Sequence, residues 1–152
     1  MADDVLYDKR SCGVALITLN RPDSLNAMGG QLMPMLADYL ADTANDRKVR
    51  CVVLTGAGRG FCAGGDVKGM AAGRDAILNA GGGENGQRSP ALEFARGVEG
   101  LRDSQRRTSL MLHTMPKPTI AMVNGHAVGA GLSLALACRC HQAARCRRPL
   151  AC

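Results

Sequence analysis

The chain has 152 residues, of which 46% are hydrophobic and 3% aromatic, and it contains no Trp. This length suffices for one domain with a hydrophobic core, and the scarcity of aromatic rings argues against modules that bind nucleic acid by base stacking. No apolar run reaches the ~20 residues needed to span a bilayer, and the acidic start lacks the apolar core of a secretion signal. We therefore expect a cytoplasmic protein that neither enters a membrane nor binds nucleic acid.

The net charge of +6 is unevenly distributed along the chain. Residues 139–152 hold four of the 19 Lys and Arg residues and no acid, so residues 1–138 carry 15 basic and 13 acidic residues. The seven cysteines are an odd number, which does not favour a disulfide framework in a chain without a secretion signal. Composition thus predicts a nearly neutral domain over residues 1–138 and a basic Cys/Arg tail over residues 139–152.

In chain order, strand patterns alternate with helix patterns, which predicts an α/β domain. Pro34 is tolerated only in a first helical turn, so the first helix is expected to begin between Gln31 and Met33. Pro116 and Pro118 end the second helix. The expected elements are a strand at 12–19, a helix at 30–45, a strand at 51–55, a glycine-rich loop at 56–66, a surface loop at 71–90, a helix at 91–115, a strand at 119–123 and a helix at 129–137.

Two segments share one design, an apolar strand that runs into glycines. The strand at 51–55 leads to Ala-Gly-Gly-Asp at 63–66, and the strand at 119–123 leads to Gly-Ala-Gly at 129–131. Glycines let a ligand approach the backbone closely, and a helix start favours negative charge. Two N–H groups that converge on one oxygen would form an oxyanion hole. Two alternatives are a simple chain reversal and a dinucleotide site, although G-x-G-x-x-G would need glycine where Phe61 stands.

Three blocks of sequence resemble the crotonase superfamily of enoyl-CoA hydratases and isomerases, over about residues 5–138. They are LNRP at 19–22 with Asn-Ala at 26–27, VLTGAGRGFCAGGD at 53–66 and KPTIAMVNGHAVGAG at 117–131. The resemblance implies a spiral of ββα units, incomplete here because the carboxy-terminal region is missing. It also implies an acyl-CoA thioester as substrate, no metal, and no separate cofactor, since coenzyme A is part of the substrate.

Position by position, the resemblance implies that the backbone N–H groups of Gly65 and Ala130 form an oxyanion hole for a thioester enolate. Residues implied along the coenzyme A path are Leu25, Ala27, Ala63, Asp66, Val67 and Lys68. Lys68 or Arg21 could meet phosphates, with solvated surface charge as the competing interpretation. Family members form homotrimers or hexamers through carboxy-terminal helices, which this chain lacks.

The chain departs from the family's hydratases at the acid–base groups. These enzymes carry two Glu residues, but Ser133 stands at the first position and the second would lie beyond Cys152. Serine is a poor general base without an activator, so we expect Ser133 to pack in the helix and the 152-residue chain to hydrate poorly. A one-base isomerase is also compatible with this sequence.

The last residues depart as well. Residues 139–152 show no strand pattern, which predicts a reading-frame change near codon 139 and a tail that adds no core. The alternative function is a noncatalytic binding module whose tail binds nucleic acid through its arginines or a metal through Cys138, Cys140, His141 and Cys146. Without later elements to cover it, the apolar helix at 129–138 should expose surface around Leu132, Leu134 and Leu136.

Overall fold

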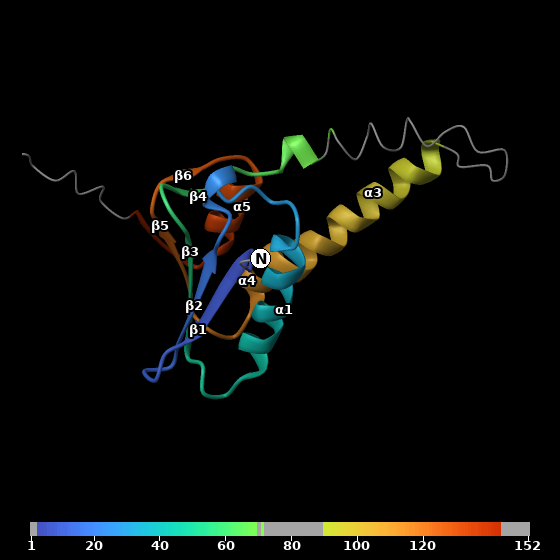
Figure 1. Ribbon diagram of the computed structural model, residues 1–152. Coiled ribbons are helices and arrows are strands. Elements are labelled where there is room, and N and C mark those ends of the chain that lie inside the picture. The colour runs from blue at the N-terminus through green and yellow to red at the C-terminus, as the bar shows by residue number, and fades with distance from the viewer. Residues whose placement is uncertain (1–2, 70, 72–89, 144–152) are drawn as a thin grey trace, which may run out of the picture.

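The computed structural model describes residues 3–69, 71 and 90–143. The surface loop expected at 71–90, except for its two end residues, and the tail residues 144–152, which include Cys146, lie outside the described residues. The main sheet has the strand order β1-β2-β3-β5-β7. Its strands are β1 (Val5–Lys9), β2 (Val14–Leu19), β3 (Cys51–Gly56), β5 (Thr119–Val123) and β7 (Cys140–Ala143). β1 is antiparallel to β2, and the other neighbours are parallel (Figure 1).

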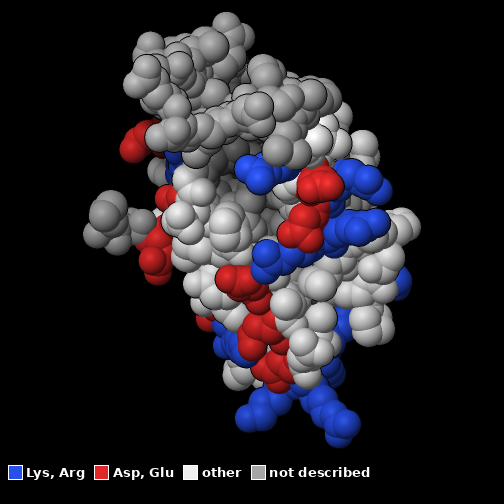
Figure 2. Space-filling model, turned by 90° about the vertical axis from the view of Figure 1, so that its right-hand side faces the viewer, with Lys and Arg blue, Asp and Glu red and all other residues white. Residues whose placement is uncertain are grey.

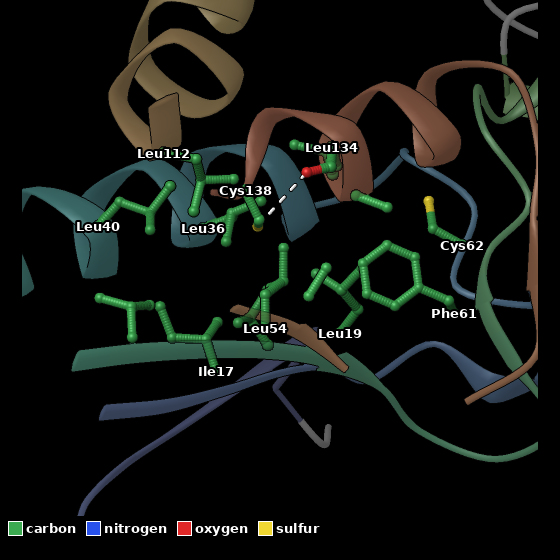
Figure 3. Close-up of a cluster of buried hydrophobic side chains, with 14 of the residues drawn as sticks. Ile17, Leu19, Leu36, Leu40, Leu54, Phe61, Cys62, Leu112, Leu134 and Cys138 are labelled. Carbon is green, nitrogen blue, oxygen red and sulfur yellow. Dashed lines mark hydrogen bonds between the residues drawn. The ribbon is translucent and has the colours of Figure 1, made fainter. Parts of the chain in front are cut away.

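Some of the helices cover this sheet and close one core, while the helix at Pro90–Gln105 extends away from it (Figure 1). The helical segments are η1 (Pro22–Ser24), α1 (Leu32–Asn45), α3 (Pro90–Gln105), the π-helical η2 (Arg106–Leu110), α4 (Met111–Thr114) and α5 (Ala130–Ala137). Leu36 and Leu40 of α1 and Leu112 of α4 point toward Ile17 and Leu54 of the sheet (Figure 3). All five side chains are fully buried, and burial of each contributes about 1.5–3 kcal/mol.

The three expected strands and the expected helices are present. α1 begins at Leu32, so Pro34 lies in its first turn as predicted. The helix predicted at 91–115 is present as one helical run from Pro90 to Thr114, in which η2 is a π-helical turn between α3 and α4. Among the described residues, every helix is too short or too polar to cross a membrane.

The glycine-rich segment at 56–66 was expected to be a loop throughout, and this is wrong for its centre. Gly60–Cys62 forms strand β4, which pairs in parallel with β6 (His126–Ala127). Phe61 and Cys62 are fully buried, so this short strand is part of the core. The three residues of β4 are too few to show the periodicity of a strand. β1 was not predicted from the sequence either.

The tail begins with a strand although its sequence shows no strand pattern. Cys140–Ala143 forms β7, which pairs in register with Ile120–Val123 of β5. Just before β7, the Arg139 amide donates to the Thr119 hydroxyl at 3.0 Å. The side chains of the first three residues of β7 are exposed. A parallel ladder uses backbone groups only, so this strand needs no apolar pattern.

The expected apolar surface on α5 is confirmed in part. Leu132 and Leu136 are 45% and 62% exposed, whereas Leu134 is 1% exposed. The first two lie four residues apart and share one helix face, and Leu134 lies on the opposite, buried face. The prediction of exposure for Leu134 is therefore wrong.

Charges of both signs lie close together on the face shown in Figure 2. On the described surface, Lys9 of β1 contacts Asp42 of α1 and Asp46, the residue that follows α1, at 2.8 Å each. Arg107 of η2 contacts Asp38 of α1 at 2.9 Å. These ion pairs connect β1 and η2 to the region of α1, although exposed pairs of this kind contribute ~1 kcal/mol or less to stability.

Candidate functional site

The first glycine loop forms a parallel bridge with the segment that precedes α1. The Met28 amide donates to the Gly64 carbonyl at 2.7 Å, and the Asp66 amide donates to the Met28 carbonyl at 3.3 Å. Met28 and Gly65 are thus the paired residues of the bridge. In a parallel ladder, the residue between the two bonded neighbours turns its own N–H away from the partner strand. The Gly65 amide therefore points away from the Met28 backbone.

The second glycine loop packs on the other side of the first. The Val128 amide donates to the Cys62 carbonyl at 3.0 Å. A Cβ atom on Gly64, whose φ is +91°, would lie 2.8 Å from the Val128 oxygen and 3.4 Å from the Ala130 nitrogen. A Cβ atom on Gly131 would overlap the Cys62 carbonyl. Glycine at these two positions is what lets the loops meet.

Ala130 is the first residue of α5, and Gly129 precedes it as N-cap with φ +53° and ψ −124°. The first N–H groups of a helix have no partner within the helix. Among the hydrogen bonds of the described residues, neither the Ala130 amide nor the Gly65 amide has an acceptor. Within the described part of the chain, both groups thus retain a free hydrogen-bonding position.

The two amides predicted as donors belong to residues that line one pocket of about 330 Å³. Its lining residues are Met28, Met33, Gly65, Gly97, Gly100, Leu101, Ser104, Gln105 and Ala130. None of these described residues has an ionisable side chain. A neutral, partly apolar pocket of this kind strengthens the interaction between N–H dipoles and a negatively charged oxygen.

Asn26 stabilises the loops from within the core and was not predicted as a site residue. It is fully buried and has φ +57°. Its Oδ1 accepts from the Arg21 amide at 2.8 Å, and its Nδ2 donates to the carbonyls of Ala57 at 2.9 Å and Gly60 at 2.8 Å. The available signal was the Asn-Ala pair itself, since asparagine tolerates the left-handed conformation better than most residues.

Asn124 holds the same loop from the other side. Its Oδ1 accepts from the Gly56 amide at 3.1 Å. Its Nδ2 donates to the Gly58 carbonyl at 2.9 Å and to the Gly60 carbonyl at 3.3 Å. The sequence indicated only a turn at Asn124. The structure shows that this side chain and Asn26 together fix residues 56–60.

The charged residues near the first glycine loop form an internal pair. Both terminal nitrogens of Arg21 donate to Asp66 Oδ2 at 3.1 Å, and Nη1 also donates to the Ala27 carbonyl at 2.8 Å. The Gly69 amide, and secondarily Arg21, hold the pKa of the Asp66 carboxyl below its usual range. Arg21 is thus engaged with a carboxylate and a carbonyl, which differs from its interpretation as a solvated surface charge.

The other residues implied along the coenzyme A path do not line the pocket that contains Gly65. Leu25 and Ala63 are half-buried and joined by a 2.9 Å hydrogen bond from the Ala63 amide, and Ala27 is buried. Val67 is 75% exposed, and Lys68 is also exposed. None of these five residues is among those that line the pocket.

Ser133 is exposed on α5, so the prediction that it packs in the helix is wrong. Its hydroxyl donates to the Gly129 carbonyl at 3.4 Å, one turn back along the same helix. Ser133 is not among the residues that line the pocket. Among the described residues, no acidic or basic side chain bonds to its hydroxyl.

The layered sheet and the paired glycine loops are those of a crotonase-type α/β fold. The structure is similar to an enoyl-CoA hydratase from Bacillus anthracis, with a TM-score of 0.70 and 31% identity over 91% of this chain and 46% of that one. It is also similar to a monofunctional enoyl-CoA isomerase from M. smegmatis, with a TM-score of 0.63 and 35% identity over 91% and 48% of the two chains.

Sequence comparison supports the same assignment. The family model for enoyl-CoA hydratase/isomerase matches residues 14–145, a range that includes β7. The 1,2-epoxyphenylacetyl-CoA isomerase of Escherichia coli (strain K12) is 40% identical over 124 residues, which are 82% of this chain and 41% of that protein. The chain belongs to the enoyl-CoA hydratase/isomerase family. It spans less than half the length of the relatives described here.

Proposed function

We propose that this chain is the part of an acyl-CoA enzyme of hydratase/isomerase type that binds the thioester and stabilises its enolate. The observation that supports the proposal is the pair formed by Gly65 and Ala130. The two residues come from separate loops, line one pocket, and have amides without an acceptor among the described residues. Such amides suit a ligand that presents one negatively charged oxygen.

The chemical role follows from where charge develops. Removal of a proton from the carbon next to a thioester carbonyl places negative charge on the carbonyl oxygen. Two fixed N–H donors stabilise that charge, and one such donor is worth about 2.7–4 kcal/mol in other enzymes. The start of α5 at Ala130 adds the favourable end of a helix dipole.

The proton transfer itself needs a group that the described pocket does not contain. No ionisable side chain is among its described lining residues, and the Ser133 hydroxyl is exposed and bonded to its own helix. The named relatives include both a hydratase and isomerases. The proposal is therefore the enolate-stabilising step that both reactions share, with poor hydration by this chain alone.

The test is equilibrium binding of three ligands to the purified chain: acetoacetyl-CoA, free coenzyme A, and a thioether analogue that lacks the thioester carbonyl. We expect acetoacetyl-CoA to bind most tightly and its enolate absorption to rise on binding, at a pH where the free ligand is mostly un-ionised. The thioether serves as a control for length and for contacts to coenzyme A. Equal affinity for all three, without enolate absorption, would refute the proposal.

A further inference from the structure

One face of α3 borders the pocket that contains the proposed oxyanion donors. The lining residues that α3 contributes are Gly97, Gly100, Leu101, Ser104 and Gln105. Their spacing of three, four, seven and eight residues from the first member places them on a single face of the helix. This face is small and neutral, since it carries two glycines, one leucine and two uncharged polar side chains.

The two glycines on this face are not required for close packing. A Cβ atom built on Gly97 or Gly100 would meet no atom within 4 Å, whereas one on Gly131 would overlap the backbone. Glycine inside a helix is less favourable than alanine. In the described structure, the effect of both glycines is to leave space beside the helix backbone.

The space opens toward the proposed donors, because Gly97, Gly100 and Ala130 line the same pocket. A thioester oxygen held by the Gly65 and Ala130 amides would place its acyl group within that pocket, close to α3. The pocket's volume of about 330 Å³ is at the lower end of the roughly 300–1,000 Å³ typical of ligand pockets.

We infer that Gly97 and Gly100 determine the size of the acyl group, because they leave room beside α3 for bulk next to the thioester. This inference rests on the proposed function and adds the size of the acyl group. A larger side chain at either glycine would project into the space that this bulk occupies. Ser104 and Gln105, one to two turns further along the same face, provide the polar side of the pocket.

The test compares binding of phenylacetyl-CoA, acetyl-CoA and free coenzyme A to the wild-type chain, Gly97→Leu and Ala95→Leu. Gly97 is the better target because Gly100 also borders a second pocket beside α1. Ala95 lies on the same helix, is exposed, and does not line the pocket. Replacement of glycine by leucine raises helix propensity, so loss of the helix is not expected.

For Gly97→Leu, we expect phenylacetyl-CoA affinity to fall roughly tenfold or more, as for bulk added to a fitted pocket, with the affinities of acetyl-CoA and free coenzyme A unchanged. Ala95→Leu should match the wild type for all three ligands. Unchanged phenylacetyl-CoA affinity in Gly97→Leu would overturn this inference and leave the proposed function intact. If the wild-type chain binds none of the thioesters better than free coenzyme A, the proposed function fails and the inference fails with it.

Discussion

Ala130→Pro would remove one proposed oxyanion donor while changing the fold little. Ala130 is the first residue of α5, a position where proline is favoured because its missing N–H would have no partner in the helix. The preceding residue, Gly129, has φ +53° and ψ −124°, the mirror image of the extended conformation that a residue before proline prefers. The main consequences are therefore loss of the N–H group and its replacement by a ring carbon, both of which act against an oxygen bound there.

Loss of one donor of this kind costs about 2.7–4 kcal/mol, or roughly 10²–10³-fold. We expect the affinity of Ala130→Pro for the acetoacetyl-CoA enolate to fall by this factor, with free coenzyme A affinity and the free energy of unfolding nearly unchanged. The control is Ala130→Gly, which keeps the N–H and should retain most of the affinity. A folded Ala130→Pro protein that binds the enolate as tightly as Ala130→Gly would show that this amide is not a donor.

Three further predictions concern stability and thiol chemistry. Asn26→Ala should lower the free energy of unfolding, measured in urea, by about 3 kcal/mol, because buried loop groups lose their hydrogen-bond partners. The control Asn45→Ala, which removes an exposed hydrogen bond, should change the free energy of unfolding by less than about 0.5 kcal/mol. Equal effects of the two substitutions would contradict the reasoning. In a chain that ends at Cys138, the free energy of unfolding should be lower by about 2–4 kcal/mol, because the hydrogen bonds between β7 and β5 are lost. A urea midpoint equal to that of the full chain would count against this prediction. Burial raises the pKa of Cys138 to about 12. Near roughly pH 8, a thiol reagent should therefore modify the exposed Cys12 well before Cys138, which mass spectrometry can follow. The reverse order would be inconsistent with the burial of Cys138.

The long elements could be predicted because their apolar residues follow one face. In α1, Leu32, Leu36 and Leu40 are spaced by four residues, and all three are fully buried. β7 could not be predicted in this way, because its ladder to β5 is made of backbone groups and its described side chains are exposed. β4 is three residues long, which is too short for any period to show.

The glycine loops could be predicted from local sequence, since each follows an apolar strand. The groups that fix them could not, because those contacts join residues far apart in the chain. Asn26 bonds to a carbonyl 34 residues away, and Asn124 bonds to an amide 68 residues away. The position of α3 beside the pocket could not be predicted for a similar reason, since only the tertiary structure shows that Gly97 and Gly100 border it.

In the proposed function, the described part of the chain contributes backbone N–H donors at the pocket and no ionisable side chain. Backbone donors are positioned by secondary structure alone, here a parallel bridge at Gly65 and a helix start at Ala130. A general base needs an ionisable group, and none is among the described lining residues. The proposed enolate stabilisation and the missing base should therefore be separable by experiment.

An external base tests this separation. In deuterated buffer, imidazole should speed exchange of the protons next to the thioester carbonyl of phenylacetyl-CoA when the wild-type chain is present, because the bound enolate is stabilised while the base comes from solution. The same imidazole should give a much smaller acceleration with Ala130→Pro, whose remaining donor is the Gly65 amide. NMR of the ligand measures the exchange rate directly. Equal acceleration by imidazole with the two proteins would mean that stabilisation at the Ala130 amide does not contribute to proton removal.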